Sequence, residues 1–162
     1  MADWKATSAR ISHTYTNHEA FRDQTLTEVM RVIAVNHARE NGPLRITLLA
    51  LELYADGVVA QFLVVQQRGP IEAKRYGMPD FRAVAHDDAG TTYHDRSYGG
   101  SGSASRSGVA YWRMSHAFAP PVPTTAREIV IRIEDLAWRE HKDGEMVETS
   151  RIAGPWEYAV RL

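Results

Sequence analysis

Hydrophobic residues recur at every second position along much of this chain, and glycine, asparagine, aspartate and proline interrupt the pattern. Such alternation places successive side chains on opposite faces of a strand. Seven or eight segments of this kind follow one another, about ten residues apart. This spacing is typical of an antiparallel β-sandwich. The pattern therefore predicts an all-β chain.

Two tight turns organise the first strands. Leu26 to Ala38 fits one face of a helix and also an alternating strand, and the Asn41-Gly42 pair that follows favours the strand, because it is a strong hairpin signal. A strand from Leu44 to about Tyr54 comes next. We expect one face of it to carry Leu49, Leu51 and Leu53, and the other Leu44, Ile46, Leu48 and Ala50. Asp56-Gly57 then leads into a strand from Val58 to Gln67, which predicts a meander.

The middle of the chain predicts another hairpin and a loop. Phe81, Ala83 and Ala85 alternate, and turn residues 87–90 separate them from a short strand at Thr91 to Arg96, so we expect these two strands to pair. Residues 97–108 are mostly glycine and serine, have little to bury, and are predicted to form a mobile loop.

The last third predicts three more strands. They are expected at Val109 to Phe118, at Arg127 to Leu136 and from Trp156 to Leu162, with a polar turn at Lys142-Asp143-Gly144. Trp112 and Trp156 alternate with other large hydrophobic residues, which places them in the core. Residues 1–25 show no steady period and are predicted to be an N-terminal arm, with residues 26–162 forming one domain.

Composition excludes several classes of protein. Nineteen basic and 20 acidic residues give a net charge of −1, which disfavours nucleic-acid binding. The chain has no cysteine, so disulfides, zinc–thiolate sites and cysteine nucleophiles are excluded. It contains no apolar run as long as a signal peptide or a spanning helix, and we expect a cytoplasmic protein without membrane insertion.

One cluster of side chains is a candidate for metal binding. It consists of His86, Asp87, Asp88, His94 and Asp95. These residue types supply the nitrogen and oxygen donors that zinc and other divalent cations use. However, Asp-Asp-Ala-Gly is also the composition that a turn requires, and it favours an ordinary polar hairpin. We therefore predict neither a metal site nor a cofactor.

Catalytic motifs are also missing from the sequence. It contains no Gly-x-Ser-x-Gly and no His-Glu-x-x-His, and the glycines of residues 99–108 lack the Lys-Ser/Thr ending of a phosphate loop. The serines lie mainly in the predicted loop, where nothing would hold a nucleophile against a base. These observations predict that the protein is not an enzyme.

Several short motifs occur in an order that resembles a known group of proteins. They are Arg31-Val32-Ile33, Thr47-Leu48-Leu49, Glu52 to Gly57, Asp88 to Tyr93, Phe118 to Pro123 and Gly154 to Tyr158. This set resembles uncharacterised bacterial immunoglobulin-like β-sandwich proteins, some related modules of which lie in the extracytoplasmic part of anti-sigma-factor-like proteins. The resemblance implies an immunoglobulin-like antiparallel sandwich and transfers no catalytic residue.

The scaffold and the missing catalytic motifs favour a binding or assembly module that contacts a protein partner, or a second copy, through loop tips or a sheet edge. Tyr98 and Arg106 are the only large groups in the predicted glycine/serine loop, so they are candidate binding residues. A second hypothesis is a small-molecule or glycan binder, or a cryptic hydrolase, with a cleft around Tyr93, His94, Tyr98 and Trp112. A third is a structural subunit of a phage or another large particle.

Overall fold

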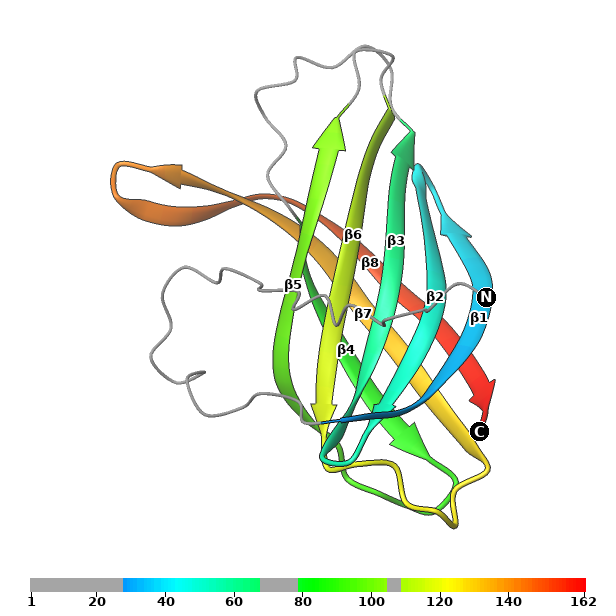
Figure 1. The fold of residues 1–162 in the computed structure, drawn as a ribbon. Helices are drawn as coiled ribbons and strands as arrows, with labels where there is room; N and C mark the ends of the chain where they lie inside the picture. Colours follow the sequence, from blue (N-terminus) through cyan, green and yellow to red (C-terminus); the bar gives the residue numbers. More distant parts are fainter. Residues whose placement is uncertain (1–27, 68–78, 105–108) are drawn as a thin grey trace, which may run out of the picture.

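The computed structural model describes residues 28–67, 79–104 and 109–162, and these residues form eight strands in two antiparallel sheets (Figure 1). The strands are β1 (Val29–Asn41), β2 (Leu44–Tyr54), β3 (Gly57–Gln67), β4 (Asp80–Asp87), β5 (His94–Ala104), β6 (Val109–Ala119), β7 (Glu128–Lys142) and β8 (Glu145–Arg161). The all-β prediction is confirmed. In the described ranges no helix is long and apolar enough to cross a membrane. The predicted arm at residues 1–25 lies outside the described residues.

The two sheets pack face to face around one hydrophobic core. The larger sheet has the order β1-β2-β3-β6-β5 and the smaller one β4-β7-β8, so the predicted β1–β3 meander is confirmed. Trp112 and Trp156 are both buried between the sheets, as predicted. The Tyr158 hydroxyl of β8 donates a hydrogen bond of 2.8 Å to the carbonyl oxygen of Ile46 in β2. This buried bond joins the two layers directly.

The first segment, for which the sequence left helix and strand open, is a strand, β1. In its neighbour β2, the residues that face the core shift by one position partway along. β1 pairs with β2, and the turn between them is Gly42-Pro43, one residue later than the predicted pair. In β2 the predicted strict alternation is wrong. Leu48 pairs with Phe62 and Ala50 with Gln61, so Leu49 is an extra residue and Leu51 takes over the core face. A bulge of this kind leaves no mark in a hydrophobic pattern.

The predicted hairpin between residues 81 and 96 is wrong. β4 pairs with β7, where Ala83 lies opposite Ile133, whereas β5 pairs with β6, where Tyr98 lies opposite His116. The connection after Asp87 therefore crosses from one sheet to the other. Alternation shows that a segment is a strand but does not choose its partner.

The predicted loop at residues 97–108 is wrong over its described part, because β5 continues to Ala104. Gly102 explains why. It lies opposite Trp112, and a Cβ at Gly102 would lie 2.1 Å from Trp112 Cδ1. The strand therefore needs a residue without a side chain here, so that the indole can cross it. Arg106 lies outside the described residues.

β7 and β8 are much longer than predicted. Their turn, Asp143-Gly144, has φ values of +53° and +87° and falls where the polar turn was expected. β4 pairs with β7 only as far as Ala137. Beyond it, residues 138–150 pair with each other alone in the described part of the chain, and they project from the sandwich (Figure 1). We call residues 138–150 the β7–β8 arm.

We expect Gly102→Ala to lower the free energy of unfolding by about 1–3 kcal/mol, the usual cost of overpacking. The added methyl group would displace the Trp112 indole, which is buried. Ser101→Ala, at an exposed position in the same strand, is the matched control and should change it by less than about 0.5 kcal/mol. Urea unfolding followed by tryptophan fluorescence measures both. Equal effects of the two substitutions would contradict this account of β5.

Candidate functional site

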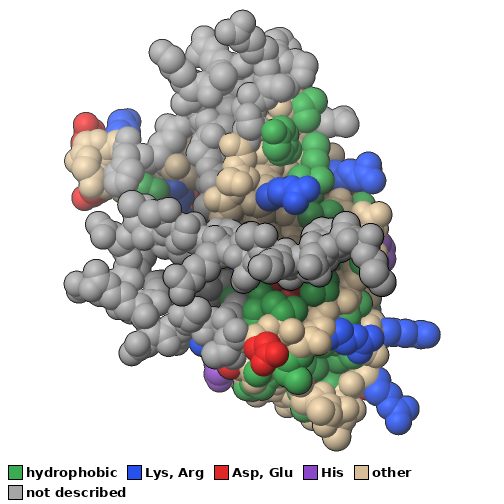
Figure 2. All heavy atoms as spheres, in the orientation of Figure 1, with side chains coloured by type: hydrophobic (Ala, Val, Ile, Leu, Met, Phe, Trp, Pro, Cys, Tyr) green, Lys and Arg blue, Asp and Glu red, His purple; other side chains and the backbone are tan. Residues whose placement is uncertain are grey.

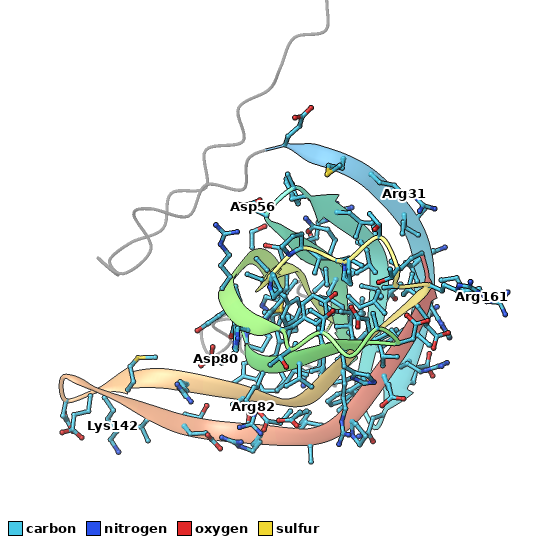
Figure 3. The ribbon with its side chains drawn as sticks, turned by 90° about the horizontal axis from the view of Figure 1, so that it is seen from below. Arg31, Asp56, Asp80, Arg82, Lys142 and Arg161 are labelled. Carbon is cyan, nitrogen blue, oxygen red and sulfur yellow. The ribbon has the colours of Figure 1, made fainter. Side chains whose placement is uncertain are left out.

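An open groove of about 300 Å³ lies at the base of the β7–β8 arm. Its lining residues come from β4, β5, β7 and β8, where an edge of the larger sheet approaches the smaller sheet. They are Asp80, Phe81, Arg82, Asp95, Tyr98, Asp135, Ala137, Arg139 and Arg151. Figure 3 shows Asp80 and Arg82 on the side of the molecule from which the arm projects.

Ion pairs link the strands around this groove. Arg139 Nη1 lies 3.0 Å from Asp80 Oδ2, which joins the arm to β4. Arg151 Nη1 lies 2.9 Å from Asp135 Oδ2, and its Nη2 lies 2.7 Å from Glu148 Oε2. The hydrogen bonds from Arg151 hold the pKa of the Glu148 carboxyl below its usual value.

Each pair is solvent-exposed and stabilises the fold little by itself. A third arginine of the groove, Arg82, pairs with Glu134. All three groove arginines are therefore neutralised by carboxylates, and an anionic ligand would have to compete for them. This arrangement suits the positioning of the arm better than the capture of a small anion.

Tyr98 forms the wall of the groove on the β5 side. Its hydroxyl is hydrogen-bonded to Asp80, and this bond together with partial burial raises the pKa of the phenol to about 12. The ring stacks on His116, with 6.1 Å between centroids and 16° between planes. Tyr98 is 42% exposed, whereas His116 is fully buried. The predicted binding residue is thus accessible, but in a strand rather than in a loop.

His116 lies behind Tyr98, beneath the groove wall, and sequence reasoning gave it no functional role. Its Nε2 lies 3.0 Å from Asp95 Oδ1 without the alignment of a hydrogen bond, and Nδ1 has no hydrogen-bond partner among the described residues. The ring is held between Tyr98 and the aromatic side chains of Phe81 and Phe118. Its alternation with the tryptophan and methionine of β6 was the signal that could have placed it in the core.

The cleft of the second hypothesis is not assembled. Of its four residues, only Tyr98 lines the groove. Trp112 is buried, with its ring 6.1 Å from that of Trp138, and the Tyr93 hydroxyl donates a hydrogen bond of 2.8 Å to Asp87. His94 begins β5 and is exposed.

The candidate metal ligands serve the crossing between the sheets. Asp87 Oδ1 accepts hydrogen bonds from the backbone N–H groups of Ala89 and Thr91, and Asp88 Oδ1 accepts them from Arg127 and Glu128. The described part of the chain holds no group of three or more side chains suited to a metal ion. These aspartates therefore close a turn and hold the start of β7.

Asp87 has a perturbed acidity. Burial raises the pKa of its carboxyl, but the hydrogen bonds from Thr91, Tyr93 and Ala89 outweigh burial, and the pKa lies below its usual value. The three donors thus favour the charged carboxylate in the folded state.

Comparison with known proteins supports the fold alone. No protein-family model matches the chain, and no curated protein sequence matches it significantly. A solved structure, described as "the conserved domain protein from Bacillus anthracis", superposes with a TM-score of 0.53 at 12% sequence identity. The match covers 82% of this chain and 48% of that one, so the chain spans about half the length of that protein. The fold is therefore shared with an uncharacterised bacterial domain.

We expect Asp87→Asn to lower the free energy of unfolding by about 1–2 kcal/mol at pH 7. Because the folded-state pKa of Asp87 is depressed, its contribution is complete above the unfolded-state pKa of about 4 and disappears as the pH falls through the folded-state value. The difference from the unsubstituted protein should therefore shrink below about pH 4. Asp143→Asn, in the exposed arm turn, is the control. Urea unfolding at several pH values measures the difference in the free energy of unfolding. A difference that does not depend on pH would contradict the prediction.

Tyr98→Ala should destabilise the protein by about 1 kcal/mol more than Tyr98→Phe. Phenylalanine loses the hydroxyl bond to Asp80 but keeps the ring on His116, whereas alanine uncovers that buried imidazole. Tyr111→Ala, at an exposed tyrosine on the neighbouring strand, controls for the loss of an aromatic ring. Thermal unfolding measures all three. Equal losses for alanine and phenylalanine at position 98 would show that the stacking contributes nothing.

Proposed function

We propose that this protein is a non-enzymatic binding module that acts through protein–protein contacts, with the β7–β8 arm as its contact element. The observation that carries the proposal is that residues 138–150 leave the sandwich as a two-stranded ribbon. An isolated two-stranded hairpin is only marginally stable in water. A partner that covers the ribbon would explain why the chain maintains it.

The side chains of the arm support this role. Met146 is 55% exposed and Val147 is 42% exposed, and as neighbours in a strand they point to opposite faces of the ribbon. All residues from 142 to 150 are exposed, so the outer part of the ribbon does not pack on the sandwich core. Both edges of the ribbon also carry backbone groups that can pair with a further strand. Strand addition is an established mode of peptide and protein recognition.

The base of the arm is built to hold it in place. Trp138 is buried, and its ring lies 6.1 Å from that of Trp112 in the opposite sheet. On the groove side, Arg139 pairs with Asp80. A contact element held at both sides of its base loses less freedom on binding than a floppy loop would.

We also propose that the fold is immunoglobulin-like. Starting at β2, the order β2-β3-β6-β5 with β4-β7-β8 corresponds to the order ABED with CFG of constant-type immunoglobulin sandwiches. On this assignment β1 is an additional strand at the edge of the larger sheet. The correspondence supports the relation to bacterial immunoglobulin-like modules that the ordered motifs imply.

A photo-reactive amino acid at position 146 should give discrete cross-linked adducts in cells of the source organism, because this position lies on the proposed contact. The same amino acid at Val84, which is 39% exposed on β4, is the matched control and should give none. Adding Val147→Ser to the position-146 probe should reduce the yield. Denaturing gels and mass spectrometry of the adducts measure this. The same adducts from both positions, or none from either, would contradict the proposal.

A further inference from the structure

A second exposed strand edge lies elsewhere on the molecule. β1 is the terminal strand of the larger sheet, and its first half carries the most exposed large hydrophobic side chains of the described residues, Met30 at 71% and Val32 at 59%. Arg31, between them, is also exposed. We call residues 29–34 the β1 edge.

The second half of β1 is attached to the smaller sheet by two side-chain hydrogen bonds. Arg39 Nε donates a hydrogen bond of 3.2 Å to the carbonyl oxygen of Glu157, and Asn41 Nδ2 donates one of 2.9 Å to that of Ala153. These bonds attach this half of β1 to β8. A bulge at Asn36, whose φ is +48°, separates the two halves. In the described structure all of β1 pairs on one side only, with β2, and these two bonds to β8 come from its second half.

The arm and the β1 edge are complementary in charge and in pattern. The arm carries four acidic and two basic residues. Near its tip Glu145 precedes the apolar pair Met146 and Val147, whereas on the β1 edge Arg31 lies between Met30 and Val32. Figure 2 shows Asp and Glu side chains together with a Lys or Arg side chain on the projecting tip, and Lys and Arg side chains along the opposite border of the view.

One chain cannot make this contact with itself. Figure 3 shows Lys142 at the far end of the arm and Arg31 on the opposite side of the molecule. The two edges can meet only between molecules. Unpaired apolar edges are prone to pair with other strands unless the protein protects them. The β1 edge carries a positive charge, and the arm carries a net negative charge.

We infer that the β7–β8 arm of one molecule docks on the β1 edge of a second copy of this chain, as an added strand with Glu145 against Arg31. This inference rests on the proposed function, because it takes the arm as the contact element and adds the identity of the partner. One ribbon on one edge makes a small interface of the transient class, so the association should depend on protein concentration.

Reversal of the two charges tests the pairing. Arg31→Glu places a glutamate against the acidic arm, and Glu145→Lys places a lysine against Arg31 and removes the net negative charge of the arm. Each single variant should weaken self-association by at least about tenfold, because like charges oppose each other across the contact. The double variant Arg31→Glu/Glu145→Lys should restore it. Sedimentation equilibrium on the full chain measures association, and thermal unfolding checks that each variant folds.

Cysteine cross-linking gives a second measurement, since the chain has no cysteine of its own. A mixture of Met146→Cys and Val32→Cys proteins should form a mixed disulfide faster than a mixture of Met146→Cys and Val84→Cys. Equal rates, or charge variants that associate like the unsubstituted protein, would overturn the inference. Adducts of position 146 with a different protein would leave the proposed function standing while self-association failed, so the two failures are distinguishable.

Discussion

The structure depends on one close approach, in which the indole of Trp112 crosses β5 at Gly102 and meets Trp138 from the other sheet. Three strands from both layers converge on this point. Any side chain at position 102 would displace the indole and with it the buried surface that supports Trp138. Because Trp138 is the first residue of the arm, the same contact that fills one end of the core also anchors the projecting ribbon. The position of the arm therefore depends on the packing of Trp112 in the core.

The sequence could predict the strands better than their partners. Alternation and turn residues located all eight strands in part, and the burial of Trp112 and Trp156 followed from their neighbours on the same face. The crossing after Asp87 could not be predicted, because its hydrogen bonds to Ala89, Thr91 and Tyr93 resemble those of an ordinary hairpin turn. The glycines and serines of β5 wrongly indicated a loop. Composition does not reveal that the Trp112 indole of the neighbouring strand occupies the position of a side chain at Gly102. The groove was missed because its residues come from four strands of two sheets, and strand alternation does not reveal how the sheets pack.

The exposed apolar side chains of the β1 edge and of the arm lie on strand edges, where they are unusual. Natural sheets protect their edges with proline, lysine, bulges or covering segments, since an unpaired edge recruits other strands. Here Arg39 and Asn41 attach the second half of β1, which follows the bulge at Asn36, to β8. Among the described residues, the first half of β1 and the arm at Met146 both combine exposed apolar side chains with a strand edge that has no neighbouring strand. Exposed apolar surface of this kind is typical of interaction sites rather than of surfaces that remain in water.

The placement of the arm and the β1 edge constrains the assembly that the proposed contact can build. The contact joins two different surfaces, the arm of one molecule and the β1 edge of the next. Two molecules can exchange arms reciprocally, or several can form a closed ring if the rotation from one to the next returns to the start. Otherwise the contact extends into a filament. The angle of the arm decides among these outcomes. That angle is held on one side by Trp138 against Trp112 and on the other by Arg139 against Asp80. The groove would then act without binding a ligand, because its ion pairs aim the arm, and weakening them would change the geometry of association while the contacting residues stayed intact.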